Sequence, residues 1–200
     1  MNEYFVPLVS KKEIAESTMA FEFEKPKDFT FQAGQSIDMT LGTQIYPFSI
    51  AASPNENLLR IVTRMRDSEF KNNLKKLKLG EKVRIQGPSG DFTLRKKSDK
   101  PIVMLAGGIG ITPFYSMIRR AREEKLPHKI SLYYRNTVPA RAAFLDELKK
   151  YNVLISDLAI DTTAVYYMAG PPAFVAKYRA RLDEAGIDED FIKTEEFDGY

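Results

Sequence analysis

Residues 101–113 read Pro-Ile-Val-Met-Leu-Ala-Gly-Gly-Ile-Gly-Ile-Thr-Pro, and this stretch decides the fold of the second half of the chain. The apolar run 101–106 predicts a buried strand. Gly107, Gly108 and Gly110 follow it, and glycine lets a backbone turn tightly and approach a phosphate closely. Thr112 suits a helix N-cap and Pro113 the first helical turn. A strand, a glycine loop and a helix in this order indicate nucleotide binding at the helix N-terminus.

Alternating strands and helices continue on the C-terminal side of this loop. The pattern predicts helices at 113–124, 140–150 and 172–185, and strands at 129–134, 153–155, 165–168 and 191–193. This order predicts a doubly wound α/β domain with a parallel sheet. Gly170, Pro171 and Pro172 follow one of the later strands. Because ligands bind beyond the carboxyl ends of parallel strands, the two glycine loops are expected to line one crevice that takes a dinucleotide.

The first half of the chain reads as short strands separated by turns. Strands are expected at 5–9, 19–23, 36–41, 48–51, 58–63 and 82–85. One helix, 69–79, interrupts them, with Ser68 as its N-cap and Gly80 as its stop. The spacing predicts a small antiparallel β-barrel. We therefore divide the chain into domains 1–97 and 98–200.

Composition excludes several classes of site. The 200 residues contain no cysteine and one histidine, His128, so disulfides, thiolate zinc sites, iron-sulfur clusters and His-pair metal sites cannot form. The net charge of +3 is too small to favour nucleic acid. No leader and no long apolar run is seen, which predicts a cytoplasmic protein without a membrane span.

Charge is unevenly distributed along the chain. Residues 64–100 hold 12 basic and 5 acidic side chains, whereas 183–200 hold 8 acidic and 1 basic. The basic region 64–100 is a candidate docking site for an acidic redox protein. Alternatively, the basic and acidic regions are two solvent-exposed faces that bind no partner.

Five motifs occur in a familiar order. They are Tyr-Pro-Phe-Ser-Ile at 46–50, Gly-Pro-Ser-Gly-Asp-Phe at 87–92, the glycine loop 107–113, Ala-Gly-Pro-Pro at 169–172 and Glu-Glu-Phe-Asp-Gly-Tyr at 195–200. In this order the chain resembles the ferredoxin-NADP reductase superfamily over nearly its whole length. The resemblance implies a flavin-binding barrel, a nicotinamide-nucleotide domain, and hydride transfer to a flavin between them.

The resemblance also implies roles for single residues. Phe48 stands where the family places an aromatic ring against the isoalloxazine, and Ser49 where a hydroxyl lies near its reactive edge. Glu195 is the expected proton relay, so Ser49 and Glu195 are the expected catalytic residues. Phe197 or Tyr200 is expected to stack on the flavin. The expected flavin-binding strand consists of Tyr46, Pro47, Phe48, Ser49 and Ile50.

The chain departs from the family pattern at two of these motifs. Tyr46 stands where the family commonly has an arginine that pairs with the flavin phosphate. Arg64 or Arg66 is expected to supply this charge, with Lys71 and the amides at the start of the 69–79 helix as other candidates. FAD is favoured over FMN. Ala169 stands where the family often has a cysteine near the nicotinamide; hydride transfer does not require it.

The loop after the second strand of the α/β half bears on the nucleotide. It contains Arg135 and Arg141 and no carboxylate before Asp146, which favours NADPH slightly over NADH. Alternatively, both arginines are solvent-exposed residues at the start of a helix and bind no nucleotide. Farther on, 156–165 is shorter than the segment that the family usually has between these strands.

The sequence therefore predicts a flavoprotein that takes a hydride from NAD(P)H onto FAD and passes electrons to a separate acceptor. That acceptor is a protein such as ferredoxin, flavodoxin or a haem protein, or a small molecule. One alternative is an electron-relay or regulatory subunit with weak nicotinamide turnover, favoured by Ala169 and the short 157–164 stretch. Another is a nucleotide-binding module without flavin.

Overall fold

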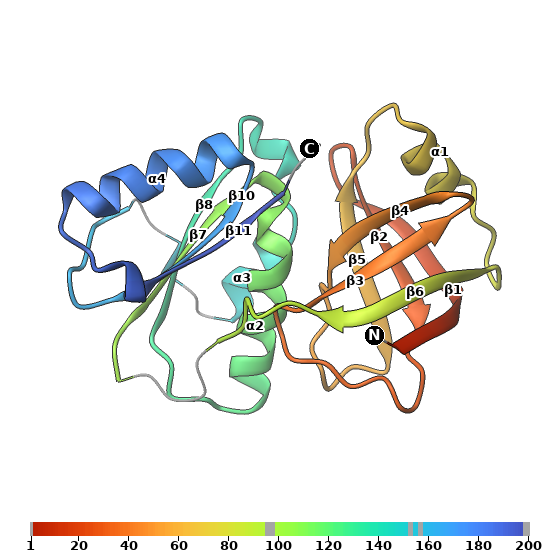
Figure 1. The fold of residues 1–200 in the computed structure, drawn as a ribbon, viewed down its shortest axis with the longest axis horizontal. Coiled ribbons are helices and arrows are strands. Elements are labelled where there is room, and N and C mark those ends of the chain that lie inside the picture. Colours follow the sequence, from red (N-terminus) through yellow and green to blue (C-terminus); the bar gives the residue numbers. More distant parts are fainter. Residues whose placement is uncertain (1, 95–98, 152–153, 156–157, 198–200) are drawn as a thin grey trace.

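The chain folds into two sheets that lie side by side (Figure 1). The structure is a computed structural model that describes residues 2–94, 99–151, 154–155 and 158–197. The first sheet is antiparallel, with the neighbour order β4-β3-β6-β1-β2-β5. Its strands are β1 (Asn2–Ala15), β2 (Thr18–Glu24), β3 (Ser36–Leu41), β4 (Gln44–Ser49), β5 (Leu58–Arg64) and β6 (Lys82–Ser89). Its edge strands β4 and β5 contact each other, so the sheet curls into the expected barrel.

Alternating burial explains why this sheet closes around a core. Ile37, Met39 and Leu41 of β3 are buried, while the residues between them are half-buried. Strands of period two place one set of side chains inside. Helix α1 (Glu69–Lys76) covers one end of the barrel with Phe70 and Leu74, both buried.

The second sheet is parallel, with the order β11-β10-β7-β8-β9. Its strands are β7 (Ile102–Gly107), β8 (Ile130–Arg135), β9 (Leu154–Ile155), β10 (Val165–Gly170) and β11 (Ile192–Glu196). Its helices are α2 (Ile111–Glu123), α3 (Leu145–Lys150) and α4 (Pro172–Glu184). Both faces of β7 are buried: Met104 packs in the cluster with α2, and Leu105 in the cluster with α4. The predicted doubly wound α/β domain is therefore confirmed.

Several predicted boundaries differ from the structure. The helix expected at 140–150 is a 3-10 turn, η2 (Pro139–Arg141), followed by α3. The ring of Phe144 stacks on Tyr115 of α2 at 3.8 Å, and its backbone turns left-handed (φ 62°), which interrupts the helix. The helix expected at 69–79 ends at Lys76, before Gly80.

The strand expected at 48–51 begins and ends earlier, as β4. The predicted domain boundary at 97/98 and the start of the strand expected at 153–155 lie outside the described residues.

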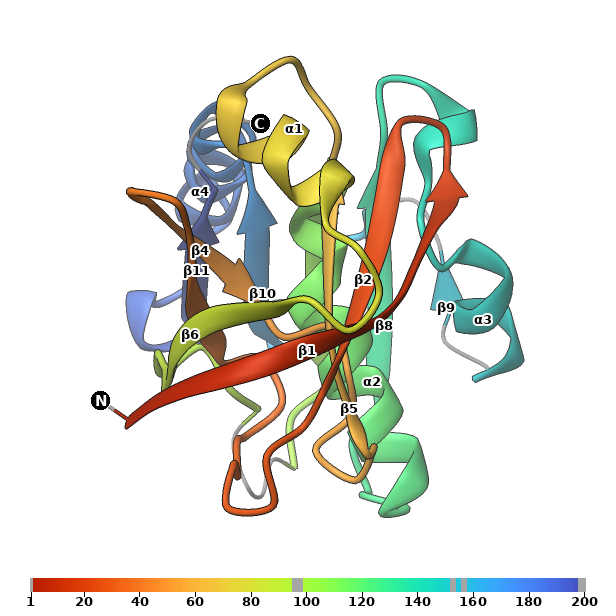
Figure 2. The ribbon, with the colours of Figure 1, turned by 90° about the vertical axis from the view of Figure 1, so that its right-hand side faces the viewer.

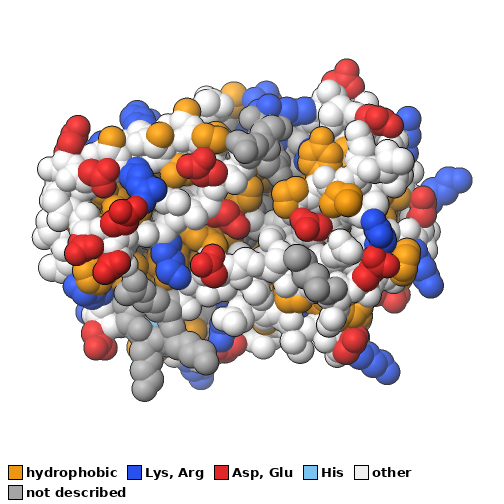
Figure 3. Space-filling view, in the orientation of Figure 1, with side chains coloured by type: hydrophobic (Ala, Val, Ile, Leu, Met, Phe, Trp, Pro, Cys, Tyr) orange, Lys and Arg blue, Asp and Glu red, His pale blue; other side chains and the backbone are white. Residues whose placement is uncertain are grey.

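Ion pairs join the barrel to α2. Arg119 of α2 pairs with Glu56 at 2.5 Å, and Arg60 of β5 pairs with Glu56 at 3.3 Å and with Glu22 at 2.8 Å. The Ser116 hydroxyl of α2 donates to the Ala52 carbonyl at 2.5 Å. Since α2 begins at the glycine loop, these contacts fix that loop relative to the barrel. On the face in Figure 3, acidic and basic side chains are interspersed over both sheets.

Candidate functional site

The structure brings together the two residues expected to be catalytic. The Ser49 hydroxyl donates to Oε2 of Glu195 at 3.3 Å across 146 residues of sequence. Burial raises the pKa of Glu195 to about 7; the Ser49 hydrogen bond opposes this shift and the Asp91 carboxylate adds to it. A carboxyl group with a pKa near neutrality can both accept and release a proton.

The aromatic side chains of β4 are arranged differently from the expectation. Phe48 is only 3% exposed and stacks on Phe70 at 5.8 Å, so its ring belongs to the barrel core. Tyr46 lies 4.4 Å from the same Phe70 ring and is 41% exposed. Phe70 of α1 therefore contacts both rings, with Phe48 buried and Tyr46 partly exposed. Pro47 is exposed and Ile50 is buried.

The start of α1 carries a buried cation. Ser68 caps the helix by accepting from the Lys71 amide, as predicted. The Lys71 ammonium donates to the Thr63 hydroxyl and lies 5.0 Å from the centre of the Phe48 ring. Burial, together with the charge of Arg66, lowers the pKa of Lys71 to about 8. A cation in this environment favours an anionic ligand nearby.

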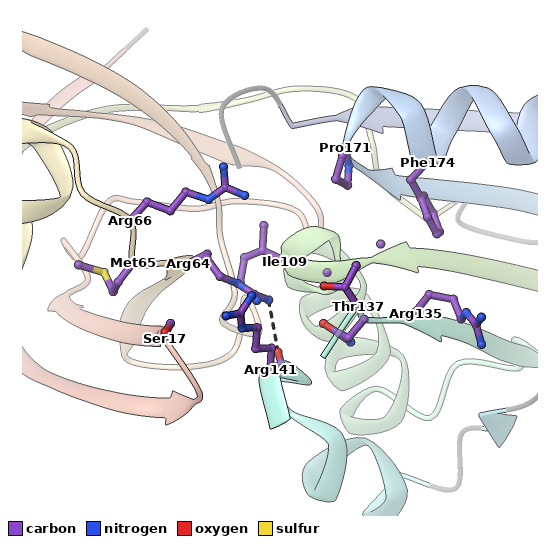
Figure 4. A pocket seen from close by; sticks show the side chains of 13 residues that line it. Ser17, Arg64, Met65, Arg66, Ile109, Arg135, Thr137, Arg141, Pro171 and Phe174 are labelled. Atoms are coloured by element: carbon purple, nitrogen blue, oxygen red, sulfur yellow. Dashed lines mark hydrogen bonds between the residues drawn. The ribbon is translucent and has the colours of Figure 1, made fainter. Parts of the chain in front are cut away.

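A pocket of about 650 Å³ lies between the two sheets (Figure 4). Four predicted arginines and two predicted glycines line it together: Arg64, Arg66, Arg135, Arg141, Gly107 and Gly108. Pro171, from the second glycine loop, lines it as well. The prediction that both glycine loops reach one crevice is confirmed. The sequence predicts Arg64 or Arg66 at the flavin phosphate, and Arg135 and Arg141 at the nicotinamide nucleotide. In the structure all four line the same pocket.

The glycines of the first loop have different surroundings. A Cβ on Gly108 would meet nothing within 4 Å, so this position is open toward a ligand. A Cβ on Gly110 would lie 2.1 Å from the carbonyl oxygen of Ala169, so this position lets the loop pack against β10. A Cβ on Gly170 would lie 3.1 Å from Gly107, where the two loops touch.

The helix start differs from the prediction. Gly110 occupies the N-cap position of α2, and no side chain caps it. Thr112 lies inside the helix, is buried, and donates its hydroxyl to the Ile109 carbonyl at 3.0 Å. The predicted capping role of Thr112 is therefore wrong, because the helix begins two residues before Pro113. The Ile111 amide already donates to the Gly108 and Ile109 carbonyls and Pro113 has no amide hydrogen, so the position open to a ligand is Gly108, in the turn that precedes α2. Pro172 begins α4, in the position that proline favours.

The C-terminal strand approaches the second glycine loop. The Phe197 amide donates to the Gly170 carbonyl at 3.0 Å, and its half-buried side chain packs against the cluster around α2. Tyr200, the alternative to Phe197 for stacking on the flavin, lies outside the described residues.

Six further pocket residues were not predicted: Ser17, Met65, Ile109, Asn136, Thr137 and Phe174. Asn136 and Thr137 directly follow Arg135, so the position of that loop was a usable signal. Ser17 comes from the tip of the β1-β2 hairpin, and no local pattern indicates that this tip reaches the other sheet.

Two further expectations concern metals and membranes. Within the described residues, no group of three or more His, Cys, Asp or Glu side chains is placed to hold a metal ion. None of the described helices is both long and apolar enough to cross a membrane.

Comparisons with known proteins match both sheets separately. Residues 5–94 match the model of the oxidoreductase FAD-binding domain, and residues 104–157 match that of the oxidoreductase NAD-binding domain. An FAD-binding domain and an NAD-binding domain are therefore present. The pocket fits a phosphate-bearing nucleotide, because it combines the open Gly108 position with four arginines.

Two relatives and one solved structure show the extent of the likeness. A flavohemoprotein of Bacillus subtilis (strain 168) is 27% identical, with 98% of this chain and 59% of that protein covered. Phthalate dioxygenase reductase of Burkholderia cepacia is 31% identical, with 70% and 46% covered. Ferredoxin-NADP+ reductase from Plasmodium falciparum has the same fold, with a TM-score of 0.82, 16% identity, and 98% and 97% covered. The chain spans less than two thirds of the length of the curated relatives. On its two domains and their fold, the chain belongs to the ferredoxin-NADP reductase superfamily.

Proposed function

We propose that this chain is an NAD(P)H-dependent flavoprotein reductase that passes electrons from NAD(P)H, through bound FAD, to a separate acceptor. The observation that carries the proposal is the arginine- and glycine-lined pocket between the FAD-binding and NAD-binding domains. The flavin, when bound, supplies the ability to accept a hydride and release electrons singly or in pairs. The protein then has to bind the flavin and the nucleotide, orient them toward each other, and supply protons.

The residues divide this work. The turn 108–110, whose Gly108 and Ile109 line the pocket, binds the nucleotide pyrophosphate, and the close approach of Gly107 to Gly170 holds the two loops together. The Ser49 hydroxyl and the Glu195 carboxyl, 3.3 Å apart, hold and move a proton at Oε2 of Glu195. Phe197 or Tyr200 provides the aromatic surface for the flavin.

Arg66, Lys71 and the Ser68-capped start of α1 hold the flavin phosphate in place of the arginine missing at Tyr46. This assignment rests on the buried ammonium of Lys71 at the start of α1 and on Arg66, which lies two residues before the N-cap and close enough to lower the pKa of Lys71. FAD remains our choice of flavin because residues 5–94 match an FAD-binding domain.

Replacing Lys71 by Met is expected to weaken FAD and FMN binding about 10- to 100-fold and to leave riboflavin binding nearly unchanged, because only the first two carry a phosphate. The flavin-free variant should also be more stable at pH 7. The pKa of Lys71 is near 8 in the folded protein and near 10.5 in the unfolded chain. Below about pH 10.5 the unfolded chain therefore binds the proton more tightly, which lowers the free energy of unfolding, and Met removes this effect. Flavin fluorescence titration and thermal unfolding measure the two effects. Equal losses for FMN and riboflavin would contradict the phosphate role.

We favour NADPH slightly over NADH, because Arg135 and Arg141 both line the pocket at the end of β8. Replacing Arg141 by Ala should lower kcat/KM for NADPH about 10-fold or more and change that for NADH little. Steady-state kinetics with both nucleotides measure this. A wild-type enzyme with the higher kcat/KM for NADH would overturn the preference.

The acceptor is a separate molecule in this proposal. The relatives include reductase components of propane 2-monooxygenase and phthalate dioxygenase reductase, which supports transfer to a partner. An acidic redox protein docking on the basic region 64–100 fits the charge distribution.

Anaerobic mixing with NADPH and with NADH tests the function directly. Rapid bleaching of the flavin absorbance is the expected result. A yellow protein that bleaches slowly with both would instead support an electron-relay subunit, which Ala169 in place of cysteine favours. A colourless protein that cannot be reconstituted with flavin would leave only a nucleotide-binding module.

A further inference from the structure

Arg64, at the end of β5, reaches toward the other domain. Nη2 of Arg64 donates to the carbonyl oxygen of Arg141 at 3.4 Å, the dashed line in Figure 4. Arg141 belongs to η2, in the NAD-binding part of the chain. Arg64 is thus a barrel residue whose charged end lies against the nucleotide domain.

The hairpin between β1 and β2 reinforces this contact. The Glu16 amide donates to the Ala140 carbonyl at 3.0 Å, and Nε of Arg141 pairs with Oε1 of Glu16 at 3.0 Å. Figure 2 shows the tip of this hairpin beside the connection that follows β8. The hairpin therefore holds η2 beside Arg64 before any ligand arrives.

Positive charge is only partly compensated here, by the ion pair of Arg141 with Glu16. Among the described residues, neither Arg64 nor Arg66 has a carboxylate within 4 Å, and no acidic side chain lines the pocket. Burial lowers the pKa of Arg64 and the charges of Arg141 and Arg66 lower it further, whereas Tyr134 and Glu16 oppose the shift without cancelling it. An anion bound between the guanidinium groups of Arg64 and Arg141 would remove the repulsion between these two.

The location of the cluster identifies the anion. Arg64 shares the pocket with Gly107, Gly108 and Arg141, whereas Tyr46 and Ser49 of the flavin strand do not line it. We propose that Arg64 binds a phosphate of the nicotinamide nucleotide, not of the flavin, so that the flavin domain completes the nucleotide site. This inference rests on the proposed function and changes the role expected for Arg64.

Calorimetric titration of the flavin-loaded protein tests it, with NADP+, NAD+ and 2′,5′-ADP as probes. Replacing Arg64 by Gln is expected to raise the Kd for NADP+ about 10- to 100-fold, as for a lost hydrogen bond to a charged group. The flavin-to-protein absorbance ratio and the Kd for FAD should stay unchanged. If the Kd rises for NADP+ and 2′,5′-ADP but not for NAD+, the 2′-phosphate lies at Arg64. If the Kd for NAD+ rises equally, the pyrophosphate lies there.

Arg120→Gln is the matched control, because it removes the same charge at the far end of α2, where Arg120 pairs with Glu124. Arg64→Lys is a second variant that keeps the charge but loses the forked donor geometry, and an intermediate Kd is expected. Unchanged NADP+ binding in Arg64→Gln, with or without loss of flavin, or equal weakening in Arg120→Gln, would overturn the inference and leave the proposed function standing. A wild-type protein that binds none of the three probes would overturn both.

Discussion

Replacing Glu195 by Gln is expected to lower turnover with NAD(P)H about 100- to 10,000-fold, the usual range for losing a positioned acid or base. Gln keeps the size and the hydrogen-bonding geometry toward Ser49 but cannot exchange a proton. The wild-type rate should follow an ionisation near pH 7, because burial raises the pKa of Glu195 to about that value. The variant should lose this ionisation from its profile of rate against pH, which steady-state assays across pH 5–9 would measure.

Stability gives a second readout that does not depend on activity. The Glu195 pKa is near 7 when folded and near 4.5 when unfolded, so between these pH values the folded state binds more protons. The free energy of unfolding therefore falls as pH rises from about 4.5 to about 7. Glu195→Gln removes this loss, so the flavin-free variant should exceed wild type by up to about 3 kcal/mol at pH 8 and by little at pH 4.5.

Glu196→Gln is the control for both measurements, because Glu196 is the exposed neighbour on the same strand. It should keep the wild-type profile of rate against pH. An unchanged profile in Glu195→Gln would show that another group carries the ionisation, and would remove Glu195 from the proposed proton path.

The sequence predicted those parts of the fold that depend on local pattern. Six strands with turns between them predicted the barrel, and the buried run of β7 with its glycines predicted the parallel sheet. Ser68 was recognisable as a cap because Ser at this place accepts from an amide in the first turn. The break in the helix at Phe144 was not recognisable, because it depends on stacking against Tyr115, far away in the sequence.

In the candidate site, too, local sequence patterns predicted some features and missed those that depend on contacts between distant segments. The proximity of Ser49 and Glu195 was expected only from the order of family motifs, since nothing local relates β4 to β11. The side chain covering Phe48 comes from α1, so the strand pattern alone could not show that its ring is buried. Arg64 and Arg141 were assigned to different cofactors because the hairpin tip that brings their segments together has no sequence signature.

Replacing Gly110 by Val is expected to abolish nucleotide-driven flavin reduction by disturbing the packing of the loop, with a lower melting temperature. The new Cβ would lie 2.1 Å from the Ala169 carbonyl oxygen, which is backbone and cannot move away cheaply. Overpacking of this kind costs about 1–3 kcal/mol or more. For a chain of this size, that corresponds to a fall of roughly 2–12 °C in Tm. Thermal unfolding and anaerobic bleaching measure the two consequences.

Gly108 separates this structural role of the loop from its binding role. Its backbone is left-handed (φ 56°), a conformation that Asn and Asp tolerate, and a Cβ there would meet nothing within 4 Å. Gly108→Asn and Gly108→Asp should therefore have similar melting temperatures. Only Asp adds a negative charge where the pyrophosphate is expected, so the Kd for NADP+ should be about 10-fold or more higher for Asp than for Asn. Equal Kd values for the two variants would show that the phosphate binds elsewhere, because a charge at the open position of the loop would then be without effect.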